Sequence, residues 1–278
     1  MLSTVPGQNA GPVGGEAEVD RMSVSTRPQN ERWVVGRLAV GTVRTRLICV
    51  PQAGAGAGAF AGWRNHIPQG YELAPVELPG RGTRDAEPMP ADFDALADRL
   101  LAGLTPELGV PYVLFGHSFG GALVYELSRR IEDRGLPAPV ATVVSGFRAP
   151  HTPPTTAMSE VSDEELLDWL IRNGGMPEEL LAYKTFVRQI MRYIRADLRI
   201  AESYSLDEPA PLPGPLHVFG GTDDQVTPPD RLPEWRACAG SDFSLTLLPG
   251  GHNYPHTDPP TMVAALMDVL AATPSHAG

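Results

Sequence analysis

An apolar run that breaks at a serine between glycines constrains this chain more than any other stretch of its sequence. The run and its break read Tyr112-Val113-Leu114-Phe115-Gly116-His117-Ser118-Phe119-Gly120-Gly121. A residue at the tip of a sharp turn between a strand and a helix has a strained backbone, and only glycine fits two positions before and after it. Gly116 and Gly120 occupy those positions. Beyond them, apolar residues recur every four positions, as on a helix face: Leu123, Leu127, Ile131. The stretch predicts a strand, a tight turn and a helix, with Ser118 at the tip as a candidate nucleophile.

Strand-like and helix-like patterns alternate along most of the chain. Further strands are predicted at residues 47–50, 71–77, 140–144, 216–219 and 243–248. A helix is predicted to begin at the N-cap Asp92, and another near the carboxyl end. Such alternation favours parallel strands joined by right-handed crossovers. We therefore expect an α/β fold with a doubly wound, mostly parallel sheet.

The 278 residues suit one large domain, or one domain with an insertion. Residues 1–30 are poor in apolar side chains, which predicts a disordered leader. Residues 147–207 show no strand pattern, only a proline-rich hinge, a helix from Asp163, a break at Gly174-Gly175 and a longer helix. We expect a core formed by residues 31–146 and 208–278, into which residues 147–207 are inserted as a helical lid.

Charge and cysteine content exclude several classes of protein. With 22 basic and 33 acidic residues, the formal charge is -11, which argues against nucleic acid or an anionic membrane as a partner. The two cysteines, Cys49 and Cys238, are too few for a disulfide framework and suit a reducing compartment. No apolar run approaches the length of a membrane span, and the first residues lack a signal-peptide pattern. We expect a cytoplasmic protein.

A loop of small residues follows the strand predicted at residues 47–50. It reads Pro51-Gln52-Ala53-Gly54-Ala55-Gly56-Ala57-Gly58. Small residues let backbone N–H groups approach a ligand, as an oxyanion hole requires. A phosphate-binding loop is the alternative, but its Gly-Lys-Ser/Thr ending is missing. The position after an early strand is that of the α/β-hydrolase pattern, so we predict an oxyanion hole made by the N–H groups of Ala53 and Phe119.

A serine hydroxyl is a weak nucleophile unless a base takes its proton, and the usual base is a histidine. Of the seven histidines, His252 stands in a loop directly after the last predicted strand, where the chain order serine, acid, histidine places the base. His217 lies inside a strand pattern and is interpreted as structural. His117 adjoins the serine, but neighbouring side chains diverge in such a turn, so we interpret it as a packing residue.

The acid is expected after the strand at residues 216–219, where two aspartates compete. We choose Asp224, because its spacing from Gly221 and Pro228 is that of a loop that offers its acid to the histidine. The alternative is Asp223, which we otherwise interpret as a turn residue that binds local backbone groups.

Several motifs together resemble a type II thioesterase of modular polyketide and nonribosomal peptide synthesis, over about residues 33–270. They are Val50-Pro51-Gln52-Ala53-Gly54, Leu78-Pro79-Gly80-Arg81-Gly82, the serine turn, Ser145-Gly146-Phe147-Arg148-Ala149-Pro150, Arg195-Ala196-Asp197 and Gly251-His252. Two residues depart from the family pattern: Gln52 stands where histidine is frequent, and Phe119 where methionine or leucine is usual.

The resemblance implies hydrolysis of acyl thioesters from the phosphopantetheine arms of acyl carrier or peptidyl carrier protein domains, an editing role in the synthesis of an antibiotic or pigment. It implies no cofactor and no metal. A small-molecule carboxylesterase or a carbon–carbon bond hydrolase with the same three residues is an alternative. A ligand-binding protein without turnover on a hydrolase scaffold is another, since fold does not fix function.

The longer helix of the predicted lid carries a basic stripe. At 3.6 residues per turn its basic residues share one direction: Lys184, Arg188, Arg192, Arg195, Arg199. A local basic stripe on an acidic protein would suit the acidic surface of a carrier domain, or the phosphate of its arm. The alternatives are a solvated helix face and, for Arg195, a pairing with a core carboxylate.

Overall fold

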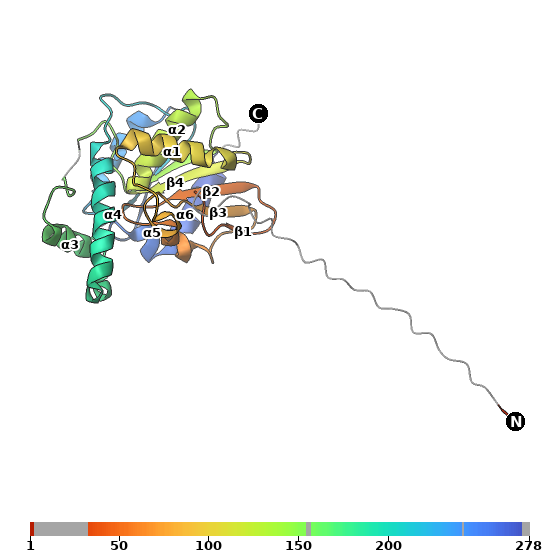
Figure 1. The fold of residues 1–278 in the computed structure, drawn as a ribbon. Helices are drawn as coiled ribbons and strands as arrows, with labels where there is room; N and C mark the ends of the chain where they lie inside the picture. The colour runs from red at the N-terminus through yellow and green to blue at the C-terminus, as the bar shows by residue number, and fades with distance from the viewer. Residues whose placement is uncertain (3–32, 154–156, 241, 274–278) are drawn as a thin grey trace.

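The computed structural model describes residues 1–2, 33–153, 157–240 and 242–273 (Figure 1). The predicted leader lies outside the described residues, apart from its first two. The strands are β1 (Leu38–Ala39), β2 (Thr45–Val50), β3 (Tyr71–Pro75), β4 (Tyr112–His117), β5 (Ala141–Ser145), β6 (Leu216–Gly221) and β7 (Phe243–Leu248). The α-helices are α1 (Phe93–Leu104), α2 (Phe119–Asp133), α3 (Asp163–Arg172), α4 (Lys184–Ser203), α5 (Tyr254–Thr257) and α6 (Pro259–Ala272).

The strands form one sheet in the order β1-β3-β2-β4-β5-β6-β7, in which only the β1–β3 pairing is antiparallel. The predicted mostly parallel sheet is confirmed. From β2 the chain moves to β3 on one side and then returns to β4 on the other. The winding direction thus reverses beside β2, and the carboxyl ends of β2 and β4 meet there. Ligand sites of open α/β sheets form at such a reversal point.

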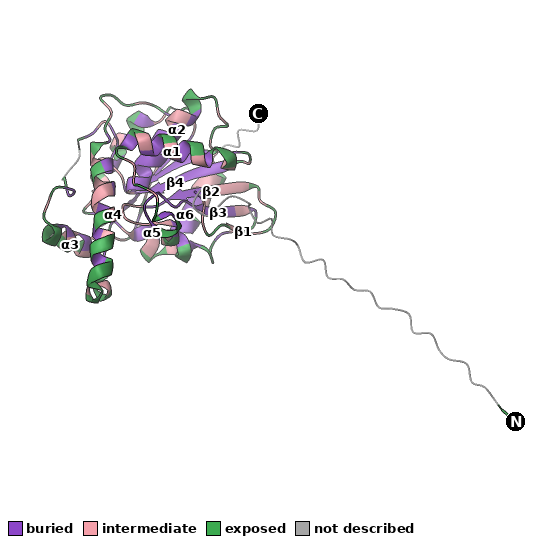
Figure 2. Cartoon of the chain, viewed as in Figure 1, coloured by how far each residue is buried: buried purple, intermediate pink, exposed green. Residues whose placement is uncertain are grey.

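Helices cover both faces of the sheet. Side chains alternate along each strand, so neighbouring residues of a strand pack against opposite helical layers. In β2, Ile48 and Val50 belong to the apolar cluster that includes α1 and α2. Leu47 and Cys49 belong to the opposite cluster, which includes α6. Figure 2 accordingly shows buried strands between partly exposed helices. The predicted N-cap of α1 is confirmed, since the Asp92 carboxylate accepts a hydrogen bond from Ala95 N at 2.8 Å.

Residues 147–207, the helical insertion, contain no strand in their described parts, 147–153 and 157–207. Their helices α3 and α4 lie together at one end of the sheet (Figure 1). α3 begins with a capping box formed by Ser162 and Glu165, and Gly174, with φ 71°, follows its end. The insertion has an apolar cluster of its own: Met158, Leu166, Leu170, Met176, Val187, Met191, Ile194. Within the described ranges, no helix is both long and apolar enough to span a bilayer.

Candidate active site

Ser118 lies between β4 and α2 in a strained conformation, with φ 52° and ψ -121°. It is the one non-glycine residue with positive φ in the described part of the chain. A Cβ at Gly116 would lie 2.0 Å from the carbonyl oxygen of Gly120, and a Cβ at Gly120 would lie 2.1 Å from that of Val50. The turn therefore needs both glycines, as the sequence pattern predicts, because backbone crosses backbone at these points.

The structure brings Ser118, His252 and Asp224 together. Nε2 of His252 lies 3.0 Å from the Ser118 Oγ, and its Nδ1 lies 2.8 Å from Oδ2 of Asp224. The other carboxylate oxygen of Asp224 accepts hydrogen bonds from the N–H groups of Val226 and Thr227, at 2.8 and 2.9 Å. Asp224 is 1 % exposed. A carboxylate held in this way can orient the imidazole and stabilise its protonated form.

Asp223 faces away from this constellation. Its side chain is exposed, and its Oδ2 accepts a hydrogen bond from the hydroxyl of Thr222 at 3.0 Å. Of the two aspartates that compete in the sequence, the structure therefore places Asp224, and not Asp223, against His252.

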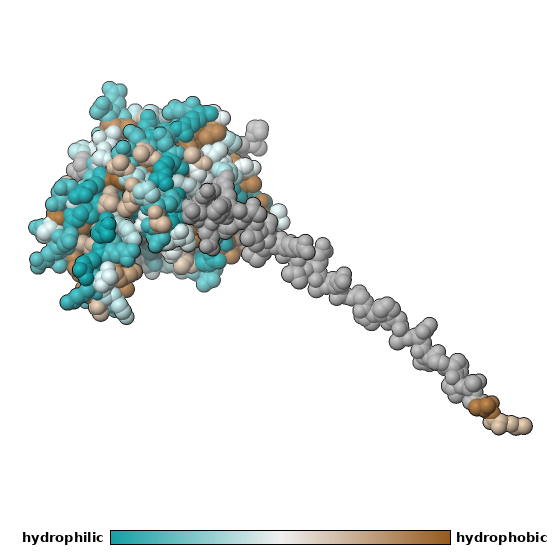
Figure 3. Space-filling model, viewed as in Figure 1, coloured by the Kyte–Doolittle hydropathy of each residue, from teal (hydrophilic) through white to brown (hydrophobic). Residues whose placement is uncertain are grey.

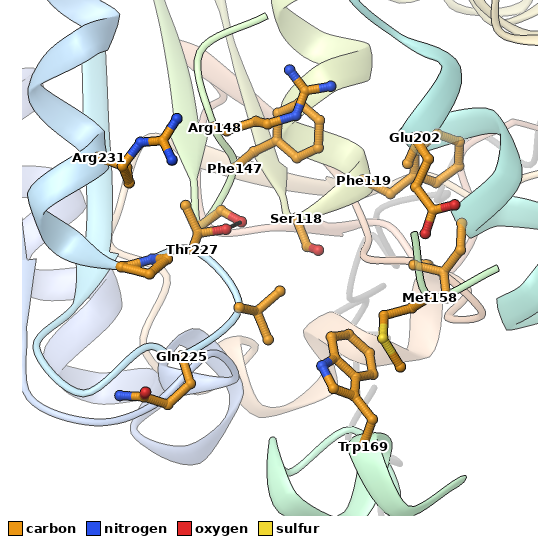
Figure 4. A pocket seen from close by; sticks show the side chains of 16 residues that line it. Ser118, Phe119, Phe147, Arg148, Met158, Trp169, Glu202, Gln225, Thr227 and Arg231 are labelled. Atoms are coloured by element: carbon orange, nitrogen blue, oxygen red, sulfur yellow. Dashed lines mark hydrogen bonds between the residues drawn. The ribbon is translucent and has the colours of Figure 1, made fainter. Parts of the chain in front are cut away.

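The backbone N–H groups of Ala53 and Phe119 come from the two neighbouring strand ends, after β2 and after β4. Neither has a hydrogen-bond acceptor among the described residues. Both residues line a cavity with Ser118 (Figure 4). Two free donors beside a strained serine form the arrangement that an oxyanion requires.

Two cavities meet at Ser118 and Ala53. The first, of about 130 Å³, is drawn in Figure 4, with Phe147 and Arg148 on one side of the serine and Trp169 and Met158 on the other. The second, of about 220 Å³, includes His252 and these residues of the insertion: Trp169, Leu170, Asn173, Gly175, Ile190, Ile194, Leu198. The insertion thus contributes to both cavities.

A buried polar layer beneath His252 was not foreseen in the sequence. His117, which is fully buried, lies 3.0 Å from the hydroxyl of Ser145 through its Nδ1, and that hydroxyl also contacts the hydroxyl of Tyr254. Burial, and then the neighbouring His252 and His256, lower the pKa of His117 well below its usual value. Burial also lowers the pKa of His256 to about 4. Its Nε2 lies 2.9 Å from Oε1 of Gln52.

These histidines are therefore neutral at ordinary pH. His117 packs, as expected, but through a hydrogen-bonded network in which one bonded pair, Ser145 and Tyr254, is 109 residues apart in the sequence, so no local pattern signals it. In the described part of the chain, no cluster of histidine, cysteine or acidic residues has the arrangement of a metal site.

The five basic residues expected to form one docking stripe do not share one role. Arg195 is directed into the insertion, where it donates to the carbonyls of Ser159 and Val161 at 2.6 and 2.7 Å and pairs with Asp163. The paired carboxylate is exposed, so the suggested pairing of Arg195 with a core carboxylate is wrong. Arg199 pairs with Glu160 at 3.2 Å.

The remaining three, Lys184, Arg188 and Arg192, are exposed and have no ion-pair partner among the described residues. Arg188 and Arg192 line a groove of about 970 Å³ between α4 and the loop that contains Gly80 and Met89. Hydrophilic side chains dominate much of the visible surface over α4, interrupted by hydrophobic ones (Figure 3).

Comparison with known proteins shows a matching family and a similar biosynthetic protein. The model of a family described as thioesterase domain matches residues 45–268. The gramicidin S biosynthesis protein GrsT of Aneurinibacillus migulanus is 30 % identical over 225 residues, which are 81 % of this chain and 88 % of that protein.

Two solved structures are also similar. One is RedJ, a thioesterase from the prodiginine biosynthetic pathway in Streptomyces coelicolor, with a TM-score of 0.77 and 30 % identity over 84 % of this chain and 93 % of the other. The second is BorB, a type II thioesterase from the borrelidin biosynthetic cluster, with a TM-score of 0.77 and 30 % identity. The match covers 86 % of this chain and 97 % of BorB.

Proposed function

The chain belongs to the thioesterase domain family, and from that premise we propose that it hydrolyses acyl groups from the phosphopantetheine arm of acyl or peptidyl carrier domains. The role is editing, the removal of stalled or wrong acyl groups during polyketide or nonribosomal peptide synthesis. The observation that carries the proposal is the hydrogen-bonded chain from Ser118 through His252 to Asp224, located where two cavities meet.

In the proposed reaction, the Ser118 Oγ attacks the thioester carbonyl while Nε2 of His252 takes the hydroxyl proton. The negative charge that develops on the carbonyl oxygen is stabilised by the N–H groups of Ala53 and Phe119. When the carbon–sulfur bond breaks, His252 returns the proton to the departing sulfur. Water then attacks the acyl-serine with His252 again as base, which releases the acid and restores the serine.

Each of the two cavities at Ser118 is proposed to bind a different part of the substrate. His252 lines the larger cavity and not the smaller one. Because this histidine must protonate the leaving sulfur, we place the pantetheine arm in the larger cavity. The acyl group then occupies the smaller one, whose 130 Å³ is comparable to an engineered cavity of about 150 Å³ that holds benzene. We therefore expect acyl chains of about six carbons or fewer to be preferred.

The insertion is proposed as a lid over these cavities, and the exposed cations Lys184, Arg188 and Arg192 as the surface that meets the carrier. A carrier domain with an acidic surface is complementary to them, whereas the protein as a whole, with its net charge of -11, would repel it.

The test is turnover of a carrier domain loaded with acyl chains of two to twelve carbons, beside an aryl ester of each acid. We expect the carrier thioesters to have the higher kcat/KM, and short chains to be favoured on both series. The Ser118→Ala variant, which lacks the proposed nucleophile, gives the background rate for both series. A higher kcat/KM for the aryl esters would instead support the carboxylesterase alternative.

A further inference from the structure

Asp197 of α4 is a buried carboxylate that contacts the loop after β2. It is 1 % exposed, and its Oδ2 accepts a hydrogen bond from the backbone N–H of Gly54 at 2.7 Å. The Arg81 guanidinium binds the same carboxylate through two nitrogens, with Nη2 2.7 Å from Oδ1. Arg81 also donates to the carbonyl of Ala55 at 3.2 Å. Two distant motifs, Pro79-Gly80-Arg81-Gly82 and Arg195-Ala196-Asp197, thus meet at this loop.

The helix and the loop are in close contact at the same place. Gly54 has φ 76°, and a Cβ there would lie 2.1 Å from Cγ1 of Ile194. Ile194 and Asp197 are three residues apart, so they share one face of α4. Ile194 covers the glycine, and Asp197, the next residue along this face, accepts a hydrogen bond from the glycine N–H. The loop can therefore not shift without α4.

Gly54 directly follows Ala53, the proposed oxyanion donor. The N–H of Gly54 and the carbonyl of Ala53 belong to the same planar peptide group. The hydrogen bond from Gly54 to Asp197 therefore fixes the orientation of the backbone next to Ala53. Oxyanion donors act only when they lie near 3 Å from the developing charge, and a displacement of about 1 Å costs roughly a hundredfold in rate.

We propose that Asp197 and Arg81 are positioning residues that hold the Ala53 N–H in the oxyanion hole by way of Gly54, and thereby tie the catalytic loop to the lid helix. This inference rests on the proposed role of Ala53. The rival account gives the buried ion pair a part in stability alone. Removing one partner of such a pair destabilises a protein strongly, while replacing both with apolar residues is often neutral. Paired variants therefore separate the two accounts.

Two double variants and one control are needed. Asp197→Leu with Arg81→Met removes both charges and leaves no acceptor for the Gly54 N–H. Asp197→Asn with Arg81→Gln also removes both charges but keeps an oxygen for that N–H. The control is Glu126→Gln, since Glu126 is a buried carboxylate that binds Arg129, Arg130 and the hydroxyl of Tyr204 at the end of α4 without contacting the loop.

The measurements are the melting temperature, kcat and KM for butyryl-pantetheine, and the affinity of an alkyl boronic acid, which forms a tetrahedral adduct with an active serine. For the Leu/Met pair we expect kcat and boronate affinity to fall together by about tenfold to a hundredfold, with KM within about threefold of wild type. The Asn/Gln pair should recover both to within about fivefold. Glu126→Gln should lower the melting temperature without lowering boronate affinity.

The inference is overturned if boronate affinity and kcat follow the melting temperature in all three variants, or if the Leu/Met pair matches wild type. Failure of the proposed function gives a different pattern. Wild-type protein would then leave butyryl-pantetheine intact, or would bind the boronic acid as well after Ser118→Ala.

Discussion

The two sides of the site are built differently. On the sheet side, all six residues of β4 are buried, and Asp224 is 1 % exposed. On the side of the insertion, α3 buries only Leu166 and Leu170 of its ten residues. At the start of α4, Tyr183 and Phe186 are 65 % and 46 % exposed. Figure 2 shows this contrast between buried strands and exposed insertion helices.

We propose that the difference separates two tasks. Proton transfer needs atoms held within a fraction of an ångström, which a close-packed sheet provides. Admission of an acyl chain on a carrier needs a surface that can open, which a weakly packed segment provides. α4 belongs to both sides, because its carboxyl half buries Asp197 and Ile200 whereas its amino half is largely exposed.

The largest effect is expected on the sheet side, at the nucleophile. Ser118→Ala should lower kcat by several orders of magnitude, with a residual rate roughly a thousandfold above that in water from the oxyanion hole. His252→Ala should behave alike, since the two residues act as a unit. Single-turnover hydrolysis of an acyl-pantetheine measures both. Near-normal turnover by Ser118→Ala would disprove the proposed mechanism.

The next effect distinguishes the two aspartates. Asp224→Asn should reduce kcat by about 10⁴-fold, because the amide would hold the wrong tautomer of His252. Asp223→Asn should change kcat by less than about threefold, since that side chain is exposed and is hydrogen-bonded to Thr222 rather than to His252. Steady-state kinetics of the two variants decide the point, and the reverse order would reassign the acid.

The third prediction concerns two histidines under the site, the partly buried His256 and the fully buried His117. The pKa of His256 is about 4 in the fold and near 6.5 in the unfolded chain, so between pH 6.5 and 4 the unfolded state binds more protons. Stability therefore falls as the pH is lowered through this window, by about 3 kcal/mol for this one group. His117 contributes in the same direction.

Urea unfolding at pH 7, 5.5 and 4.5 tests this. We expect the loss of unfolding free energy at low pH to be smaller in His256→Gln than in wild type. Parallel curves of unfolding free energy against pH for the two proteins would show that the pKa of His256 is the same in the folded and unfolded states.

The fourth prediction addresses the insertion. Amide hydrogens of α3 should exchange at least about tenfold faster than those of α2, which buries eleven of its fifteen residues. An alkyl boronate bound at Ser118 should slow exchange in α3 and leave α2 unchanged. Exchange in α3 as slow as in α2, with and without the boronate, would contradict a mobile lid.

Local patterns in the sequence were sufficient to predict most elements of the fold. β7 spans the six residues with a strand pattern, and α1 begins at its predicted cap, because strand alternation and capping depend on near neighbours. β1 spans only Leu38 and Ala39, and both residues pair with β3 at the sheet edge. Its length is set by the available partner and not by its own residues.

The site was predictable to the extent that chain order fixes it. Ser118 and His252 follow from their positions after strands, while the choice of Asp224 rested on loop spacing. The contact of Arg81 with Asp197 joins residues 116 positions apart. A single sequence marks both motifs but cannot show that they meet. The same holds for Arg195, whose partner carbonyls lie on a loop more than thirty residues earlier.

The smallest effect is expected at the surface of the insertion, where Arg188 and Arg192 lie beside the groove at α4. Reversing both to glutamate should raise KM for an acyl-carrier protein several-fold, because surface charges act mainly on encounter. KM for butyryl-pantetheine should stay unchanged, since neither residue lines the cavities at Ser118. The rise should shrink as salt is added, because the distance over which charges are screened falls from about 10 Å at 0.1 M to about 3 Å at 1 M.

The matched control reverses Arg44 and Arg236, two exposed arginines outside the insertion, which gives the same change in net charge. If the control raises KM for the carrier protein as much as the α4 variant does, net charge alone accounts for the effect. An equal rise for carrier and butyryl-pantetheine would instead indicate that the α4 variant distorts the cavities. Only a rise specific to α4 and to the carrier assigns this helix face to docking, because it alone separates local charge from both alternatives.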